Sequence, residues 1–208
     1  MVDRFTLYVT AGSGNSYKPV LVGHQLGLNL KLRFMNVLEG ETRKAAFLKI
    51  NPRGTVPYML FPDGTGLGES NALAWYLAEG SLLIPADPLH RAQAIQWMIF
   101  EQTLLEPNIS PARFFTYVLP EQRDAHAHEI PLWHERGNRA LQLLDAHLNK
   151  QDFVTQAGYS VADVAVYGYT HMAEQGGFDL SRYPAVGAWI RRVQETPGYA
   201  PVTALLPV

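Results

Sequence analysis

The chain has 208 residues, of which 47% are hydrophobic and 17% are charged, and its formal net charge at pH 7 is −2. This composition is that of a globular protein with one or two domains, and it excludes a disordered chain. The near-neutral charge without a basic block argues against a nucleic-acid binder, and the apolar runs are too short to span a membrane.

Cysteine is absent from the sequence, and this limits the chemistry. The chain can form neither a disulfide nor a zinc–thiolate site, and it has no thiol of its own to act as a nucleophile. If the protein handles sulfur, the sulfur must arrive with a ligand. The N-terminal segment MVDRFTLYV lacks the charged start, apolar core and cleavage site of a signal peptide, so we expect a cytoplasmic protein.

The first 80 residues alternate between strand and helix patterns, which predicts a small α/β unit with a mixed sheet. Pro19 fits the first helix only if it lies in the first turn, and Pro52 ends a short second helix. Ser70 is expected to cap the third helix, and Gly80 follows its end. The predicted elements are a strand at 5–10, a helix at 17–28, a strand at 29–37, a short helix at 41–52, strands at 56–61 and 64–69 joined by a PDG turn, and a helix at 70–80.

The second half of the chain has a different pattern. Two prolines mark residues 81–88 as a linker, and only helical patterns follow. Residues 89–208 therefore predict an all-helical domain. Pro107 and Pro111 should kink or break its first helix. Further helical stripes lie at 129–150 and 183–199.

The sharpest local signal in this half is the segment YSVADVAVYGY at 159–169. Ser160 can cap a helix and Asp163 sits at the third helical position, so the pair forms a variant of the capping box. Tyr159 and Val164 occupy the two positions of the hydrophobic staple. We therefore expect a helix to begin directly after Ser160, with Asp163 in a structural role.

The stretch AGSGNSYKP at 11–19 is the first of three segments that could bind a ligand. It joins the first strand to the first helix, where open α/β sheets place their ligands. Ser13, Asn15 and Ser16 offer hydroxyl and amide groups near a helix N-terminus, and such surroundings stabilise an anion such as a thiolate. The stretch matches neither glycine-rich phosphate-loop pattern. An ordinary turn is the alternative.

The other two segments are GESNALAWY and GTVPYM. Ser70 is either a plain N-cap or part of a site that binds a ligand carboxylate at the positive end of the helix, with Glu69 beside it for a ligand ammonium. An α-carboxylate and an α-ammonium would then be bound within two residues. Val56-Pro57 stands at a strand start, where a trans bond is the commoner form. A cis bond there would leave the Val56 backbone to pair with a peptide-like ligand.

Together these segments resemble the cytosolic glutathione S-transferase family, and the resemblance covers nearly the whole chain. FLKINPRGTVPYM is similar to the family's strand-leading motif with its cis Val-Pro bond, ESNALAWYLAE to its γ-glutamyl-binding motif, and YSVADVAVYGY to the buried capping box of its helical domain. Each motif is weak by itself, but the three in this order are specific. The resemblance implies a thioredoxin-like domain at 1–80, a linker at 81–88 and an all-α domain at 89–208. It is closest to a bacterial subgroup.

The resemblance also implies a binding role for matching residues. Glu69 and Ser70 match the pair that holds the γ-glutamyl group of glutathione. Val56 matches the residue whose backbone pairs with the cysteinyl unit, and Pro57 matches the cis proline. Many members carry Lys, Arg or Gln just before this Val-Pro pair, where it reaches the glycyl carboxylate, but this chain has Thr55 there. Candidates for the missing cation are Arg53, Lys49 and Arg43.

The thiol is expected at the opening stretch. Ser13 and Asn15 lie where serine-type or Thr/Asn-type members hold the thiolate, with Ser13 the first choice. Ser16 and Tyr17 are further candidates, although Tyr17 falls within the first predicted helical turn.

The helical domain is expected to carry the electrophile-binding side of the cleft, with Arg113, Tyr117 and Tyr167 as candidate residues. Most aromatic side chains of this domain are expected in its core. His126 and His128 are two residues apart, a spacing that does not converge on a metal ion from a helix, so we expect no metal site.

The resemblance therefore implies a glutathione transferase that activates the glutathione thiol for attack on a small apolar electrophile. Glutathione is a co-substrate, no other cofactor is implied, and a homodimer without nucleic-acid or membrane partners is expected. One alternative is glutathione-dependent reduction of a disulfide or peroxide at the same site. A second is a non-catalytic ligand-binding or adaptor protein, which Thr55 favours and the intact Glu69-Ser70 pair disfavours.

Overall fold

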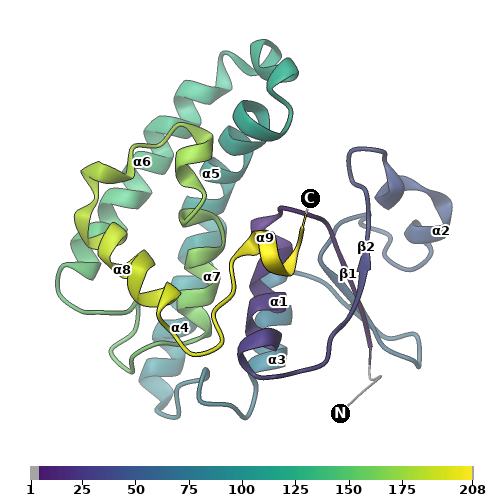
Figure 1. The fold of residues 1–208 in the computed structure, drawn as a ribbon, viewed down its shortest axis with the longest axis horizontal. Helices are drawn as coiled ribbons and strands as arrows, with labels where there is room; N and C mark the ends of the chain where they lie inside the picture. The colour runs from purple at the N-terminus through teal and green to yellow at the C-terminus, as the bar shows by residue number, and fades with distance from the viewer. Residues whose placement is uncertain (1–4, 208) are drawn as a thin grey trace. The chain divides into compact units, whose positions relative to one another are not determined.

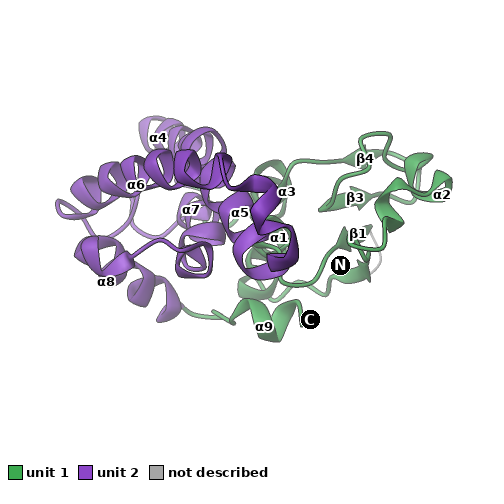
Figure 2. Ribbon diagram, turned by 90° about the horizontal axis from the view of Figure 1, so that it is seen from above, with its two compact units in different colours: residues 1–84, 197–208 green, residues 85–196 purple. Residues whose placement is uncertain are grey.

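The computed structural model describes residues 5–207, so residues 1–4 of the predicted first domain and Val208 lie outside the described residues. The described parts of the chain form two compact units, one from Met1–Ile84 with Pro197–Val208 and the other from Pro85–Thr196 (Figure 2). The sequence placed 197–208 in the helical domain, whereas the structure groups this segment with the first unit. No helix within residues 5–207 is both long and apolar enough to cross a lipid bilayer.

The first unit is built on a mixed sheet, as predicted. The described residues form four strands in the order β2-β1-β3-β4. β1 (Thr6–Val9) pairs in parallel with β2 (Lys31–Phe34), whereas β3 (Tyr58–Leu60) runs antiparallel to both β1 and β4 (Gly66–Leu67). Parallel pairing of β1 with β2 requires a crossover, which the intervening helix supplies.

Helices cover both faces of this sheet. α1 (Gly14–Gln25) and α3 (Ser70–Ala78) lie side by side on one face, and α2 (Ala45–Leu48) lies on the other (Figures 1 and 2). The predicted helix at 41–52 is split into a 3₁₀ turn, η1 (Glu41–Arg43), and α2, because Lys44 between them has extended backbone angles. Phe47 of α2 packs with Tyr8 and Met35 in a small buried cluster.

The first helix begins earlier than the sequence predicted. α1 starts at Gly14, because the Ser13 side chain caps it by accepting a hydrogen bond of 3.2 Å from the Ser16 amide. Pro19 consequently lies inside α1 instead of in its first turn. Because proline has no amide hydrogen, it cannot donate to the carbonyl of Asn15. Residues 14–16, which the sequence assigned to the connection before the helix, therefore belong to the helix itself.

The C-terminal segment is fastened to α1 and to the turn before it. The Tyr17 hydroxyl donates to the Ala200 carbonyl at 2.7 Å, and the Gly12 amide donates to the Leu206 carbonyl at 3.3 Å. A short helix that the sequence did not indicate, α9 (Val202–Leu205), lies in this segment. These bonds are the reason that 197–208 belongs to the first unit.

The regular elements described in the second unit are all helices, as predicted. Pro107 and Pro111 do not break the chain's helical path, because Pro107 lies in the first turn of α5 and π-helical turns flank that helix. The elements are α4 (Pro88–Phe100), the π turn η2 (Glu101–Leu105), α5 (Glu106–Arg113), the π turn η3 (Phe114–Val118), the 3₁₀ helix η4 (Pro120–His126), α6 (Glu129–Leu148), α7 (Val161–Thr170), the 3₁₀ turns η5 (Ala173–Gly176) and η6 (Leu180–Arg182), and α8 (Pro184–Gln194).

The predicted capping box is present at the start of α7. The Asp163 carboxylate is fully buried and accepts hydrogen bonds from the Ser160 amide and hydroxyl, the Val154 amide and the Trp189 indole. Burial raises the pKa of Asp163 to about 6, although these hydrogen bonds favour the carboxylate. Asp163 therefore has a structural role that reaches beyond its own helix.

Candidate functional site

The N-termini of α1 and α3 meet at a hydrogen bond. The Ser70 hydroxyl, at the first residue of α3, donates to the Asn15 side-chain oxygen at 3.1 Å. Ser70 is buried and Asn15 is partly buried. Two segments that are 55 residues apart in the chain, and that the sequence treated as separate candidates, thus lie at one place.

Lys18 joins the same cluster, and the sequence analysis missed it. Its side chain is fully buried, and Nζ donates to the Asn15 oxygen at 3.0 Å and to the Ser70 hydroxyl oxygen at 3.4 Å. Lysine is almost never fully buried without a partner or a function. The available signal was a single charged residue within the otherwise apolar run YKPVLVG at 17–23.

The other candidates of the opening stretch differ in what they contact. Ser13 is partly exposed at the start of α1 and keeps its hydroxyl hydrogen for another acceptor, because it only accepts from the Ser16 amide. Ser16 is fully buried and accepts from the Thr10 amide at 3.1 Å. Tyr17 is fully buried, and its hydroxyl contacts the C-terminal segment. Ser13 and Asn15 are therefore the less buried polar groups at this helix end.

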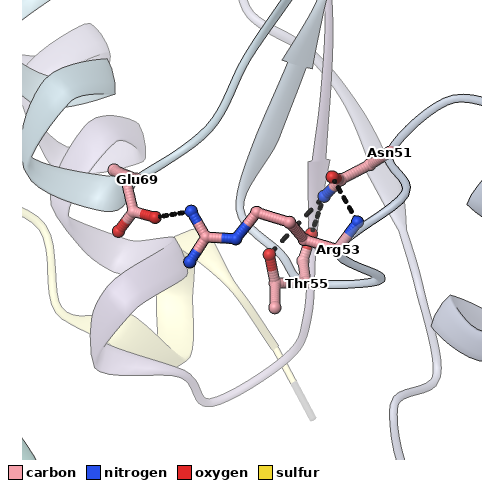
Figure 3. A network of polar contacts seen from close by, with 4 residues as sticks. All are labelled: Asn51, Arg53, Thr55 and Glu69. Carbon is pink, nitrogen blue, oxygen red and sulfur yellow. Dashed lines mark hydrogen bonds and ion pairs between the residues drawn. The ribbon is translucent and has the colours of Figure 1, made fainter.

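The loop before β3 is held by Asn51 (Figure 3). The Asn51 amide nitrogen donates to the Thr55 carbonyl at 2.8 Å, and its oxygen accepts from the Arg53 amide at 3.2 Å. The Val56-Pro57 bond that follows is cis, as the motif predicted. Arg43 donates from its guanidinium to the Arg53 carbonyl at 3.1 Å, so it supports this loop from η1.

Glu69 connects this loop to α3. Its carboxylate forms an ion pair with the Arg53 guanidinium (Figure 3), and both side chains are more than half exposed. The Glu69 backbone has φ 66° and ψ 115°, which is strained for a residue with a side chain and costs about 1–3 kcal/mol. Glu69, and not Ser70 as predicted, occupies the N-cap position, because the Ser70 hydroxyl bonds to Asn15 instead of to its own helix.

Two of the three predicted electrophile-binding residues lie together in the second unit. The Arg113 guanidinium is buried, donates from Nε to the Gln175 side-chain oxygen at 2.6 Å, and lies 5.4 Å from the centre of the Tyr117 ring. Burial lowers the pKa of Arg113. Tyr117 itself is exposed. The Arg113 cation is therefore held between an amide oxygen and an aromatic ring.

Tyr167 is placed differently. It is fully buried in α7, its ring stacks on His171 with 4.3 Å between ring centres, and its hydroxyl accepts from the Gln194 side chain at 3.2 Å. Burial, with a smaller contribution from the nearby Arg113 charge, lowers the pKa of His171 to about 4. Tyr167 thus belongs to the packed interior of this unit.

The second unit also has surface hollows that the sequence did not predict. One of about 800 Å³ is lined from α6, η6 and the start of α8, and includes Arg136, Arg139 and Arg182. A smaller one of about 290 Å³ is lined by η2, α5 and α6. Neither includes the three residues predicted to bind an electrophile.

Comparisons with known families cover both units. Residues 12–79 match the model of the glutathione S-transferase N-terminal domain, and residues 105–197 match that of the C-terminal domain. The chain is 32% identical over 185 residues to glutathione S-transferase D7 of Drosophila melanogaster. The alignment covers 86% of this chain and 80% of that protein.

Solved structures give the same result. A glutathione S-transferase from Pseudomonas fluorescens is 40% identical with a TM-score of 0.92, covering 96% of this chain and 99% of that one. A possible glutathione S-transferase from Rhodopseudomonas palustris is 44% identical with a TM-score of 0.93, covering 95% and 89%. A glutathione transferase from Phanerochaete chrysosporium in complex with oxidized glutathione is 25% identical with a TM-score of 0.84, covering 98% and 96%.

Proposed function

Because the chain belongs to the glutathione S-transferase family, we propose that it binds glutathione in its first unit and activates the glutathione thiol for attack on a small apolar electrophile. The observation that carries the proposal is the hydrogen bond between Ser70 and Asn15. It brings the segment proposed for the γ-glutamyl group next to the segment proposed for the thiol, and these two groups are neighbours in glutathione.

The γ-glutamyl group is assigned to Glu69 and Ser70. The amides of the first turn of α3 and the positive end of its dipole favour the α-carboxylate, to which the Ser70 hydroxyl can turn. Glu69 offers a carboxylate to the α-ammonium, and its ion pair with Arg53 fixes the direction of that side chain. The strained backbone of Glu69 supports this assignment, because such strain gathers at ligand sites.

The rest of glutathione is assigned to the loop before β3. The cis bond to Pro57 leaves the Val56 backbone for pairing with the cysteinyl unit, and Thr55 lies beside it on the exposed side of the loop. Arg53 is the cation assigned to the glycyl carboxylate, since Arg43 already supports the loop backbone. An arginine keeps several donors after one ion pair, so Arg53 can serve both Glu69 and a ligand.

The thiol is assigned to Ser13 and Asn15. A hydroxyl donor and an amide donor at the N-terminus of α1 stabilise the thiolate over the thiol. Since the chain has no cysteine, glutathione supplies the nucleophile, and the protein supplies binding, orientation and a lower thiol pKa. Arg113 and Tyr117 of the second unit are assigned to the electrophile. Tyr167 can act there only through the residues that pack on it.

Reduction of disulfides or peroxides is the second candidate, favoured by the oxidized glutathione in the Phanerochaete chrysosporium relative. For either reaction we propose a cytoplasmic protein and a homodimer, of which the homodimer rests on the family resemblance alone. Sedimentation at micromolar concentration checks the dimer, and a single 23.2 kDa species would contradict it.

The test begins with glutathione binding, measured by calorimetry for the wild type, Glu69→Ala and Ser70→Ala. Loss of a hydrogen bond to a charged group costs about 1.5–3 kcal/mol, so each variant should bind roughly tenfold or more weakly. A panel of aryl halides, hydroperoxides and mixed disulfides then separates transferase from reductase. Absence of glutathione binding to the folded wild type would refute the proposal, and binding without any turnover would leave a ligand-binding protein.

A further inference from the structure

Arg113 carries a positive charge that has no negative partner in the described part of the chain. Its side chain is buried at the end of α5. Within residues 5–207, the ionisable groups that interact with its charge are the phenols of Tyr117 and Tyr169 and the imidazole of His171. Neither a phenol nor an imidazole is an anion at neutral pH. Because arginine stays charged in proteins, burying this guanidinium without an anion is unfavourable.

The guanidinium is held in place from two sides. Its Nε donates to the Gln175 side-chain oxygen at 2.6 Å, and its Cζ lies 5.4 Å from the centre of the Tyr117 ring. Gln175 is next to Arg113 because η5 approaches α5 closely, so that a Cβ atom at Gly176 would lie only 3.0 Å from the Arg113 amide nitrogen. Tyr117 comes from the π turn η3, and π turns are frequent at functional sites. The position of Arg113 thus depends on the packing of three elements.

The two terminal nitrogens of Arg113 are open to a ligand. Of the guanidinium nitrogens, only Nε makes a hydrogen bond within the described residues. Neither Nη1 nor Nη2 is among the fully buried polar atoms that lack a hydrogen bond, so both keep some contact with solvent. With Nε occupied, the guanidinium presents its far end, where two parallel N–H groups match the two oxygens of a carboxylate.

We propose that Arg113 binds the carboxylate of a ligand through Nη1 and Nη2, while the aromatic body of that ligand packs on the exposed ring of Tyr117. The inference rests on the proposed function and refines it, because it assigns the electrophile to one class, aromatic electrophiles that carry a carboxylate. A neutral electrophile would leave the buried cation unpaired. A carboxylate pairs with it where little water screens the two charges.

The first measurement uses ligands that cannot react. Each protein is titrated by ligand-observed NMR with nitrobenzoate and with nitrobenzamide, which differ in charge but hardly in shape. The wild type should bind nitrobenzoate about tenfold more tightly, as expected for hydrogen bonds between charged groups. Arg113→Met should lose this preference. Arg191→Met, which removes a charge from an exposed position in α8 of the same unit, should keep it.

A second variant tests the charge without removing the buried side chain. Gln175→Glu keeps the size of the side chain and gives Arg113 a carboxylate from the chain itself, whose oxygens can accept from Nε and one terminal nitrogen. This variant should also lose the preference for nitrobenzoate, and it should unfold at no lower urea concentration than the wild type. If Arg113 were merely structural, the same change would leave the preference as it is.

The last measurement connects this site to the reaction. Each protein receives glutathione with a chloronitrobenzoate or with the matching chloronitrobenzamide. The thiolate sulfur bonds to the carbon that carries chlorine, an electron pair moves into the ring and its nitro group, and chloride then leaves with its bonding pair. After division by the uncatalysed rates, kcat/KM should favour the benzoate about tenfold in the wild type and in Arg191→Met, but not in Arg113→Met or Gln175→Glu.

Equal affinity of the wild type for nitrobenzoate and nitrobenzamide, or a preference that persists in either folded variant at Arg113 or Gln175, would overturn the inference and leave the proposed binding of glutathione intact. Calorimetry that finds no glutathione binding to the wild type would overturn the proposed function, and with it the role of this ligand as an electrophile.

Discussion

At the scale of single residues, Ser13 and Asn15 are the two side chains on which the proposed thiol chemistry depends. Ser13 also caps α1, whereas Asn15 is tied to Lys18 and Ser70. A free cysteine thiol has a pKa of about 8.5, so only a few per cent is ionised at neutral pH without help from the protein. The two residues can be told apart because only one of them caps a helix.

We expect Ser13→Ala and Asn15→Ala each to raise the pKa of bound glutathione's thiol, followed by thiolate absorbance against pH, and to leave binding largely intact. Ser13→Ala should in addition lower the free energy of unfolding by about 1 kcal/mol through the lost cap. If neither single variant nor the double variant moves the thiol titration, the opening stretch is only a connection.

His171 provides a pH-dependent prediction. Its pKa is about 4 in the folded protein against 6.5 ordinarily, so the folded state disfavours the protonated ring. The stability that it contributes is present above pH 6.5 and is lost as the pH falls toward 4. The loss amounts to about 2 kcal/mol between pH 6.5 and about pH 5. Asp163 acts in the opposite sense, because its raised pKa of about 6 adds stability as the pH falls through the same window.

We therefore expect His171→Asn to abolish the loss of folding stability at low pH, so that the opposite contribution of Asp163 can be measured. Urea unfolding at the two pH values should show that acidification lowers the free energy of unfolding by about 2 kcal/mol less in the variant than in the wild type. Equal pH differences in both proteins would mean that His171 does not protonate on unfolding in this range.

At the scale of elements, two buried or half-buried aspartates start helices in different ways. Asp163 closes the capping box of α7 and also binds Val154 and Trp189. Asp145 of α6 accepts through Oδ1 from the amides of Ala185 and Val186, so a residue from another helix caps α8, and its Oδ2 accepts from the exposed Asn149 side chain at 3.1 Å. An amide can replace a carboxylate where the second oxygen accepts only from an exposed side-chain amide that can turn over, but not where both oxygens accept from backbone or ring donors.

Asp163→Asn should accordingly lower the free energy of unfolding by about 3 kcal/mol, because its new amide hydrogens meet other donors. Asp145→Asn, the same chemical change in the same unit, should cost less than about 1 kcal/mol. Denaturant unfolding of both variants measures the difference. Similar costs for the two would show that the four bonds to Asp163 do not act as a network.

At the scale of the whole molecule, the last residues of the chain complete its first unit. The bond from Tyr17 to Ala200 joins positions 183 residues apart. Tyr17→Phe should lower the free energy of unfolding by about 1 kcal/mol. In a chain that ends at Tyr199 the same substitution should cost less, because the Ala200 carbonyl that accepts this hydrogen bond is gone. If Tyr17→Phe instead raises the pKa of the bound glutathione thiol, the Tyr17 hydroxyl belongs to the ligand site.

The local signals of the sequence predicted much of this fold because their causes are local. Strand and helix periodicity, the Ser160–Asp163 spacing and the segment before Val56-Pro57 each depend on residues within a few positions of one another. The mixed sheet, the helical second half and the capping box were predicted in this way, whereas the cis bond was implied by the family resemblance of its motif. The family followed from the order of these motifs.

Only the tertiary structure could decide which distant groups meet. The predicted start of α1 was wrong because the Ser13 cap begins the helix at Gly14. Pro19 therefore lies inside the helix and not in its first turn. The predicted N-cap of α3 was wrong because the Ser70 hydroxyl donates its hydrogen bond to Asn15 and does not cap its own helix. The burial of Lys18, the cap of α8 and the return of 197–208 to the first unit likewise depend on contacts between segments that no spacing rule relates. The sequence by itself therefore determined the elements and the family, whereas long-range packing decided which polar groups form the site.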